Sequence, residues 1–322
     1  MLIEVPRPVA DAILGAMEAV ALVHGEAGMT PKDRRTIAAA GRIAFGFDEE
    51  AAMTPLPVRT PDELARVLTD AEQARVACRV LSIMTAVDMT LDHDKVALVR
   101  EYAGALDVHE DYLEVLRESV NDEMSSAAAC MIRKNLLSFP ALDHGVGDAL
   151  DAFLPYRDGR EEPELAARYA ALGELPEHTF GWAFWDHFHR NGFAFPGAPD
   201  GLSEGFTTPH DSSHVMAGYS TSQAGEICVS TFIGAMHPDH PMAAEILPVL
   251  FSWHMDIKLN EIAGSFRGAF EPERFWTAWD RGHGMRVDLL DADWDFWEAT
   301  EVPLDELREQ YGLAPAEPEL RP

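Results

Sequence analysis

Apolar positions recur at helical spacing through the first 135 residues of the chain. Between residues 9 and 24 they fall at Val9, Ile13, Met17 and Val20, which lie on one side of a helix with 3.6 residues per turn. The same spacing, with Thr, Asp or Pro at several starts, predicts further helices at 31–44, from 61, at 70–87, 92–105, 109–120 and 121–135. The alternation that indicates strands is not evident in this half, so we predict a helical domain over residues 1–137.

Residues 138–163 interrupt this pattern. They contain Pro140, Pro155 and Pro163 together with several Gly and Asp residues, a composition that favours turns, so we interpret the segment as a linker. Helical periodicity resumes afterwards, and it predicts helices at 164–172, 182–191, 241–266, 273–282 and 303–311. We therefore expect an all-α protein with two helical domains, over residues 1–137 and 164–322.

Composition and charge limit which partners the protein is expected to bind and in which compartment we expect it. The 322 residues carry 25 Lys and Arg against 55 Asp and Glu, a formal charge of -30, which argues against binding to nucleic acid or electrostatic docking on anionic membranes. Three separated cysteines predict reduced thiols in a cytoplasmic protein. A secretory signal and an apolar run of ~18 residues are not found. We expect a cytoplasmic protein, peripheral to the inner membrane face at most.

Candidate chemistry is concentrated in one short helix that begins near residue 208. Thr208 can cap this helix, with Pro209 in its first turn. At 100° per residue, His210 and His214 point about 40° apart, and Asp211 lies within about 100° of both. The sequence therefore predicts three potential metal ligands on one face of about one helical turn.

A fourth polar residue follows across a turn. Gly218 can end the first helix, and Ser220 with Gln223 can form a capping box for the next. Glu226 then falls at the start of a strongly apolar helix, where a carboxylate is costly to bury unless a positive group compensates it. His210, Asp211, His214 and Glu226 together indicate a divalent metal site, since imidazole and carboxylate ligands suit zinc, iron or manganese.

Other interpretations of these residues stay open. Asp211 could complete a capping box with Thr208, His214 could be a hydrogen-bonded core histidine, and Glu226 could pair with an Arg. A zincin protease needs Glu directly after the first His, where this chain has Asp. A phosphohydrolase of the HD type would use the His-Asp pair with an upstream histidine, for which His178 and His187 are candidates. That interpretation gives His214 and Glu226 no role.

The pattern His210-Asp211-x-x-His214, then eleven residues, then Glu226 resembles the motif of the coenzyme Q (ubiquinone) biosynthesis family of the Coq-four type. The resemblance covers roughly residues 165–315. It also includes residues 175–181, 190–193, Gly218-Tyr219, Gly225, Arg281-Gly282, Asp293-Trp294 and 303–313.

The resemblance implies an all-helical fold and a bound divalent metal, usually zinc, with His210, Asp211, His214 and Glu226 as ligands. It implies a role in quinone biosynthesis on a polyprenylated hydroxybenzoate ring. That role is either oxidative decarboxylation at the carboxyl-bearing carbon or a non-catalytic, lipid-binding scaffold with a structural metal. The expected partners are a prenylated aromatic lipid, other quinone-biosynthesis proteins and a second copy of the chain. Five aromatic residues are either ordinary core residues or candidate walls of a groove for the prenyl tail: Trp182, Phe184, Trp185, Phe188 and Phe232.

In the N-terminal half, residues 84–95 (MTAVDMTLDHDK) resemble the acidic inter-helix turn of tellurite-resistance TerB-like domains. A calcium-binding EF-hand does not fit this turn. Counting Asp88 as the first loop position puts His93 where Gly is needed and Val99 where Glu is needed. The alternative is an acidic helix N-terminus, which the helix dipole favours.

Overall fold

The computed structural model describes residues 3, 5–54, 56–142, 149–259 and 264–313. Within them the protein is all-α, as predicted: it consists of helices α1–α17 with three short π or 3₁₀ segments. Strand pairing in these residues is limited to two isolated bridges, Thr179 with Pro303 and Met255 with Arg267. The chain divides into two compact units, residues 1–131 with 246–280 and residues 132–245 with 281–322.

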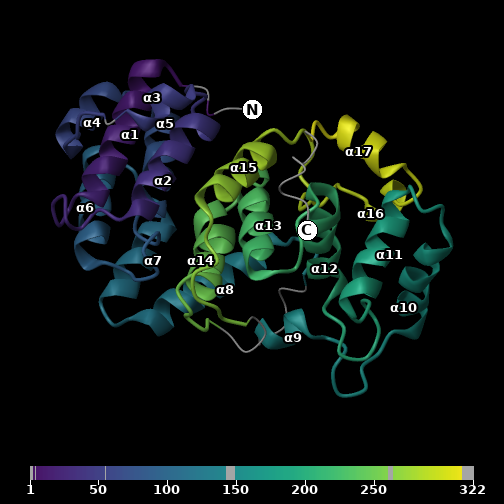
Figure 1. Ribbon diagram of the computed structural model, residues 1–322. Coiled ribbons are helices and arrows are strands. Elements are labelled where there is room, and N and C mark those ends of the chain that lie inside the picture. The colour runs from purple at the N-terminus through teal and green to yellow at the C-terminus, as the bar shows by residue number, and fades with distance from the viewer. Residues whose placement is uncertain (1–2, 4, 55, 143–148, 260–263, 314–322) are drawn as a thin grey trace. The chain divides into compact units, whose positions relative to one another are not determined.

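The first unit is built on α1, which packs against α2, α4, α5 and α6. Ile13, Met17 and Val20 are completely buried, as their spacing predicts. Thr30 and Thr60 form capping boxes at the starts of α2 and α4, each worth about 1 kcal/mol. The elements (Figure 1) are α1 (Arg7–Ala21), α2 (Pro31–Ala39), π-segment η1 (Ala40–Ala44), α3 (Glu49–Met53), α4 (Pro61–Val67), α5 (Ala71–Ile83), α6 (His93–Ala105), α7 (Asp111–Val120) and α14 (Leu247–Trp253).

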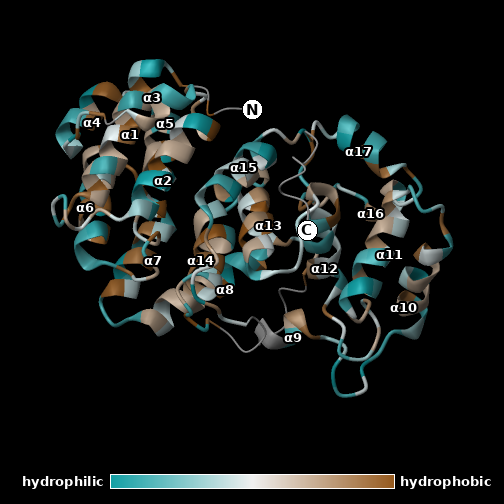
Figure 2. Cartoon of the chain, in the orientation of Figure 1, coloured by the Kyte–Doolittle hydropathy of each residue, from teal (hydrophilic) through white to brown (hydrophobic). Residues whose placement is uncertain are grey.

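The second unit holds the candidate metal ligands. Tyr169 is completely buried there and packs in an aromatic cluster with Phe184, Phe195, Phe296 and Trp297. Brown and teal patches alternate along the helices of both units, as amphipathic helices require (Figure 2). The elements are α9 (Ala149–Phe153), α10 (Pro163–Ala170), 3₁₀ segment η2 (Ala171–Glu174), α11 (Phe180–Asn191), α12 (Glu204–Ala217), α13 (Gln223–Met236), π-segment η3 (Pro241–Ile246), α16 (Phe296–Ala299) and α17 (Leu304–Gln310). The helices α8 (Met124–Ser138) and α15 (Pro272–His283) contribute residues to both units.

This division differs from the predicted domains in two respects. Residues 246–280 belong to the unit of the N-terminal helices, and the range 132–163 belongs to the second unit. The predicted linker contains α9, and its residues 143–148 lie outside the described part of the chain.

The predicted helix over 241–266 is wrong. A π-segment covers Pro241–Ile246, and α14 ends at Trp253. Asp256 then has a φ of 60°, a left-handed conformation that a right-handed helix cannot contain. The backbone N–H of Phe266 returns to the carbonyl oxygen of Ser252. Long-range pairing therefore replaces helical pairing, although the apolar spacing continues.

Among the residues that the structure places, no helix combines the length and the apolar character that crossing a membrane requires.

Candidate metal centre

The helix that carries His210, Asp211 and His214 starts earlier than predicted. α12 begins at Glu204, because the Ser203 side chain accepts the N–H of Phe206 and caps the helix there. Thr208 is not the cap: its hydroxyl lies 2.7 Å from the Tyr169 hydroxyl, inside the unit. The predicted capping role of Thr208, and a first-turn position for Pro209, are therefore wrong.

The C-terminal end of α12 is fixed by a glycine and two arginines. Gly218 ends the helix with a φ of 73°, as predicted. Arg281 and Arg308 donate to the carbonyl oxygens of residues 215–217 at 2.8–3.0 Å. These carbonyls lack partners within the helix, and cations are favoured at a helix C-terminus. Arg281 and Arg308 both belong to segments that resemble the coenzyme Q family, so these two segments hold the helix that carries the predicted ligands.

The turn into α13 is closed more tightly than the sequence indicated. Ser222 caps this helix by accepting the N–H of Gly225, so the predicted capping pair Ser220 and Gln223 is wrong. A Cβ atom on Gly225 would lie 1.9 Å from the Ser220 carbonyl oxygen, which only glycine avoids. This close approach places Glu226 in the first turn of α13, and α12 and α13 pack side by side (Figure 1).

The structure brings the four predicted ligands together. Glu226 Oε1 lies 3.5 Å from His214 Nε2, and Glu226 Oε2 lies 4.0 Å from His210 Nε2. Asp211 Oδ2 lies 3.7 Å from His210 Nδ1. Ligand atoms of His210, Asp211 and His214 all lie within 4.8 Å of one another. The separations among His210, Asp211 and His214 are short enough for one cation, since zinc–ligand distances are about 2.0–2.3 Å. Glu226 approaches the same two histidines from α13.

One nitrogen at this site tests whether the residues fit a metal. The His214 side chain is 1% exposed, and its Nδ1 lies 3.1 Å from the Tyr219 carbonyl oxygen. Because a carbonyl only accepts, Nδ1 carries a hydrogen, and in the neutral ring Nε2 then carries the lone pair. Among the described residues, His214 Nε2 has no hydrogen-bond partner. A buried polar atom without a partner is costly, and a cation would remove that cost.

The electrostatics favour ionised carboxylates at this site. Burial raises the pKa of Glu226, but contact with His214 and the charge of His210 outweigh it and lower the pKa overall. Burial likewise raises the pKa of Asp211, but the hydrogen bond from His187 and the nearby His210 outweigh it and lower the pKa well below its usual range. For His210, burial lowers the pKa, but Asp211 and Glu226 outweigh it and raise the pKa. The site thus favours positive charge.

His187 is a neighbour of the candidate metal site that the sequence pattern did not indicate. It lies on α11, where its Nε2 is 2.9 Å from Asp211 Oδ1 and its ring stacks on that of His214 at 5.4 Å. Sequence had raised His187 only as a candidate for a phosphohydrolase. The contact joins residues 24 positions apart on different helices, so spacing alone could not reveal it. His178, the other candidate, is exposed.

Glu245 is a second residue that sequence reasoning missed. It is 3% exposed in η3 and accepts a hydrogen bond from the Ser138 hydroxyl at 2.9 Å. Burial raises the pKa of Glu245, and the charges of His210 and His237 oppose that rise. The available signal was a single carboxylate within the apolar run from 242 to 247.

The remaining predicted features have structural roles. Asp92 caps α6 by accepting the N–H groups of Asp94 and Lys95. This agrees with the alternative interpretation of the acidic turn as a helix N-terminus. Of the five candidate groove aromatics, three are core residues and two are partly exposed: Phe184, Phe188 and Phe232 are buried, and Trp182 and Trp185 are intermediate.

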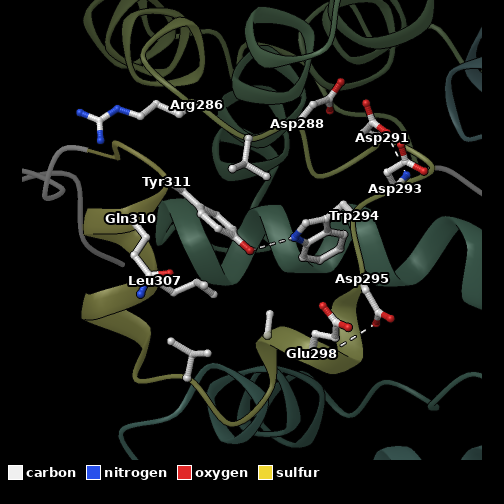
Figure 3. Close-up of a pocket in the computed structure, with 13 residues that line it drawn as sticks. Arg286, Asp288, Asp291, Asp293, Trp294, Asp295, Glu298, Leu307, Gln310 and Tyr311 are labelled. Atoms are coloured by element: carbon white, nitrogen blue, oxygen red, sulfur yellow. Dashed lines mark hydrogen bonds between the residues drawn. The ribbon is translucent and has the colours of Figure 1, made fainter.

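The second unit also contains a pocket of about 540 Å³ that none of the four predicted ligands lines. Its walls come from residues 286–311, with Trp294 Nε1 donating to the Tyr311 hydroxyl at 3.1 Å (Figure 3). Several carboxylates face it, but Asp291 and Asp295 already accept backbone N–H groups of nearby residues. Asp288 lies 2.6 Å from His237 Nδ1. These groups stabilise turns and a short helix.

Comparison with known proteins finds no matching family model and no matching curated protein. The two family resemblances therefore stay predictions.

Proposed function

We propose that this protein binds one divalent cation through His210, Asp211, His214 and Glu226. The observation that carries the proposal is the buried Nε2 of His214, which has no hydrogen-bond partner among the described residues and lies 3.5 Å from a Glu226 oxygen. Two imidazoles and two carboxylates are a set that zinc accepts in proteins. Zinc is therefore the proposed metal.

We further propose that the site acts in prenyl-quinone biosynthesis on a polyprenylated hydroxybenzoate ring, by oxidative decarboxylation at the carboxyl-bearing carbon. In that reaction the bond from the ring to the carboxyl group breaks, CO2 leaves, a hydroxyl from water takes its place, and an external oxidant accepts two electrons. The support is the motif resemblance, joined to the positions of its outlying residues, since Arg281 and Arg308 both hold the end of α12. A bound metal would supply a Lewis acid for the ring's carboxylate and phenolate. The side chains of His210 and Glu226 are partly exposed, at 16% and 20%.

Elemental analysis of purified protein tests the metal first. Wild type is expected to hold about one metal per chain, and His214→Ala and Glu226→Ala to hold far less. Wild type without stoichiometric metal would contradict the site, and retention in both variants would contradict the ligand set.

A second experiment tests the substrate: metal-loaded protein is given a prenylated hydroxybenzoate and an external oxidant. Absence of both binding and turnover would contradict the substrate class. Binding without turnover would favour the scaffold role.

A phosphohydrolase of the HD type is the second candidate function. It is favoured by the contact between His187 Nε2 and Asp211 Oδ1, since such enzymes use an upstream histidine beside the His-Asp pair. Hydrolysis of p-nitrophenyl phosphate by manganese-loaded protein, with Asp211→Asn as the inactive control, would support this candidate. Equal background rates in the two proteins would exclude it for this substrate.

A further inference from the structure

The orientation of the Asp211 carboxylate is set by a residue from a different helix. Asp211 Oδ1 lies 2.9 Å from His187 Nε2 on α11, a normal hydrogen-bond length. Asp211 Oδ2 lies 3.7 Å from His210 Nδ1, beyond a hydrogen bond. One oxygen is thus held by a hydrogen bond from another helix, and the other lies beside His210 Nδ1.

The direction of this hydrogen bond follows from the chemistry of its two groups. An ionised carboxylate only accepts, so the hydrogen lies on His187 Nε2. While that bond is kept, His187 Nε2 has no lone pair for a metal. His187 therefore belongs to the surroundings of the ligands.

His187 is itself held in place by packing. Its ring stacks on His214 with 25° between the planes and meets Phe193 edge-on at 6.0 Å. Its side chain is only 12% exposed. Since few alternative rotamers fit such surroundings, the N–H stays directed at Asp211 without further loss of side-chain entropy on metal binding.

We propose that His187 is a positioning residue: it fixes Asp211 through Oδ1 so that Oδ2 is presented to the cation shared by His210, His214 and Glu226. This inference rests on the proposed metal site. The terminal torsion of a free aspartate is broad, so without His187 the carboxylate must be ordered when the metal binds. Loss of such a supporting hydrogen bond typically weakens metal affinity by about 10–100-fold.

Two substitutions separate the hydrogen bond from the packing. His187→Gln keeps an N–H donor near the position of Nε2 but removes the ring, and His187→Phe keeps a ring but removes the donor. His189→Gln is the matched control, because His189 is exposed on the same helix and stacks on Trp185. Zinc affinity of the full chain is measured by competition with a chromophoric chelator. The visible spectrum of the cobalt(II)-loaded protein reports the coordination geometry, and circular dichroism reports folding.

We expect His187→Phe to lose about 10–100-fold in zinc affinity with a changed cobalt spectrum, and His187→Gln and His189→Gln to stay within a few-fold of wild type. Equal losses in the Phe and Gln variants, or loss in Gln alone, would overturn the positioning role, because the ring would then be the required part. Unchanged affinity in both would also overturn it. Wild type without zinc binding would overturn the metal site itself, a result distinguishable from failure at His187.

Discussion

His214 and His254 are two equally buried histidines in different units, and their surroundings differ in kind. Their exposures are 1% and 0%. His254 Nε2 donates to the Val87 carbonyl oxygen at 3.0 Å, and His254 Nδ1 accepts from the Phe270 N–H at 3.2 Å. Both nitrogens of His254 are therefore satisfied by backbone groups. Within the described part of the chain, His214 has a hydrogen-bond partner on one nitrogen only.

The charges around the two sites reinforce this difference. Burial lowers the pKa of His254 to about 4, so this ring is neutral near pH 7. At the candidate metal centre, carboxylates raise the pKa of His210 despite its burial. A buried histidine thus indicates a metal ligand only when one nitrogen is open and carboxylates stand beside it. Burial alone does not distinguish the two cases.

The largest expected effect is on stability, from His254→Ala. The change leaves the Val87 carbonyl and the Phe270 N–H without their partner and creates a cavity, so we expect a loss of about 3 kcal/mol in the free energy of unfolding. Zinc affinity should stay within a few-fold of wild type. Urea denaturation and chelator competition measure the two quantities. A large loss of zinc affinity in a folded variant would break the distinction between the two histidines.

Zinc should stabilise wild type by about 2.7 kcal/mol at a free concentration 100 times its dissociation constant. His254→Gln is expected to gain a similar amount and His214→Ala almost nothing, because only the second substitution removes a ligand. Thermal or urea unfolding with and without zinc provides the measurement. Equal stabilisation of both variants would mean that zinc binds elsewhere.

Removing the hydrogen bonds from Arg308 to the C-terminal end of α12 should have a smaller effect. Arg308→Met keeps the aliphatic stem but removes the donors to the Met216 and Val215 carbonyl oxygens. We expect a loss of roughly 1–2 kcal/mol in stability and a few-fold loss of zinc affinity. Glu309→Gln, an exposed change on α17, is the control. Identical results for the two variants would show that the Arg308 hydrogen bonds do not hold the candidate site in place.

The smallest expected effect is the pH dependence that His254 contributes. Its folded pKa of about 4 lies below its ordinary value of 6.5, so between these values the unfolded chain binds more protons. The contribution to stability is therefore full above pH 6.5 and is lost as the pH falls through this window. From pH 7 to pH 6 we expect a loss of roughly 1 kcal/mol. Urea midpoints of metal-free wild type and His254→Gln measure it, and equal slopes would exclude His254 as the source.

The sequence by itself determined the local features of this protein. Helical spacing predicted the all-α fold and the buried face of α1. His214 follows His210 by four positions, a spacing that necessarily places both rings near one another on a helix. Gly218 was identifiable as a helix end because the left-handed conformation strongly favours glycine. Such features depend on residues within a few positions of each other.

Tertiary structure alone decided the remainder. The end of α14 and the contact of His187 with Asp211 depend on groups distant along the chain. Val87 and His254, which form one hydrogen bond, are 167 positions apart. Periodicity shows which face of a helix is apolar, but it does not show which residue lies opposite. It therefore indicated His214 as a ligand candidate, whereas only the fold revealed that one of its nitrogens lacks a hydrogen-bond partner among the residues that the structure describes.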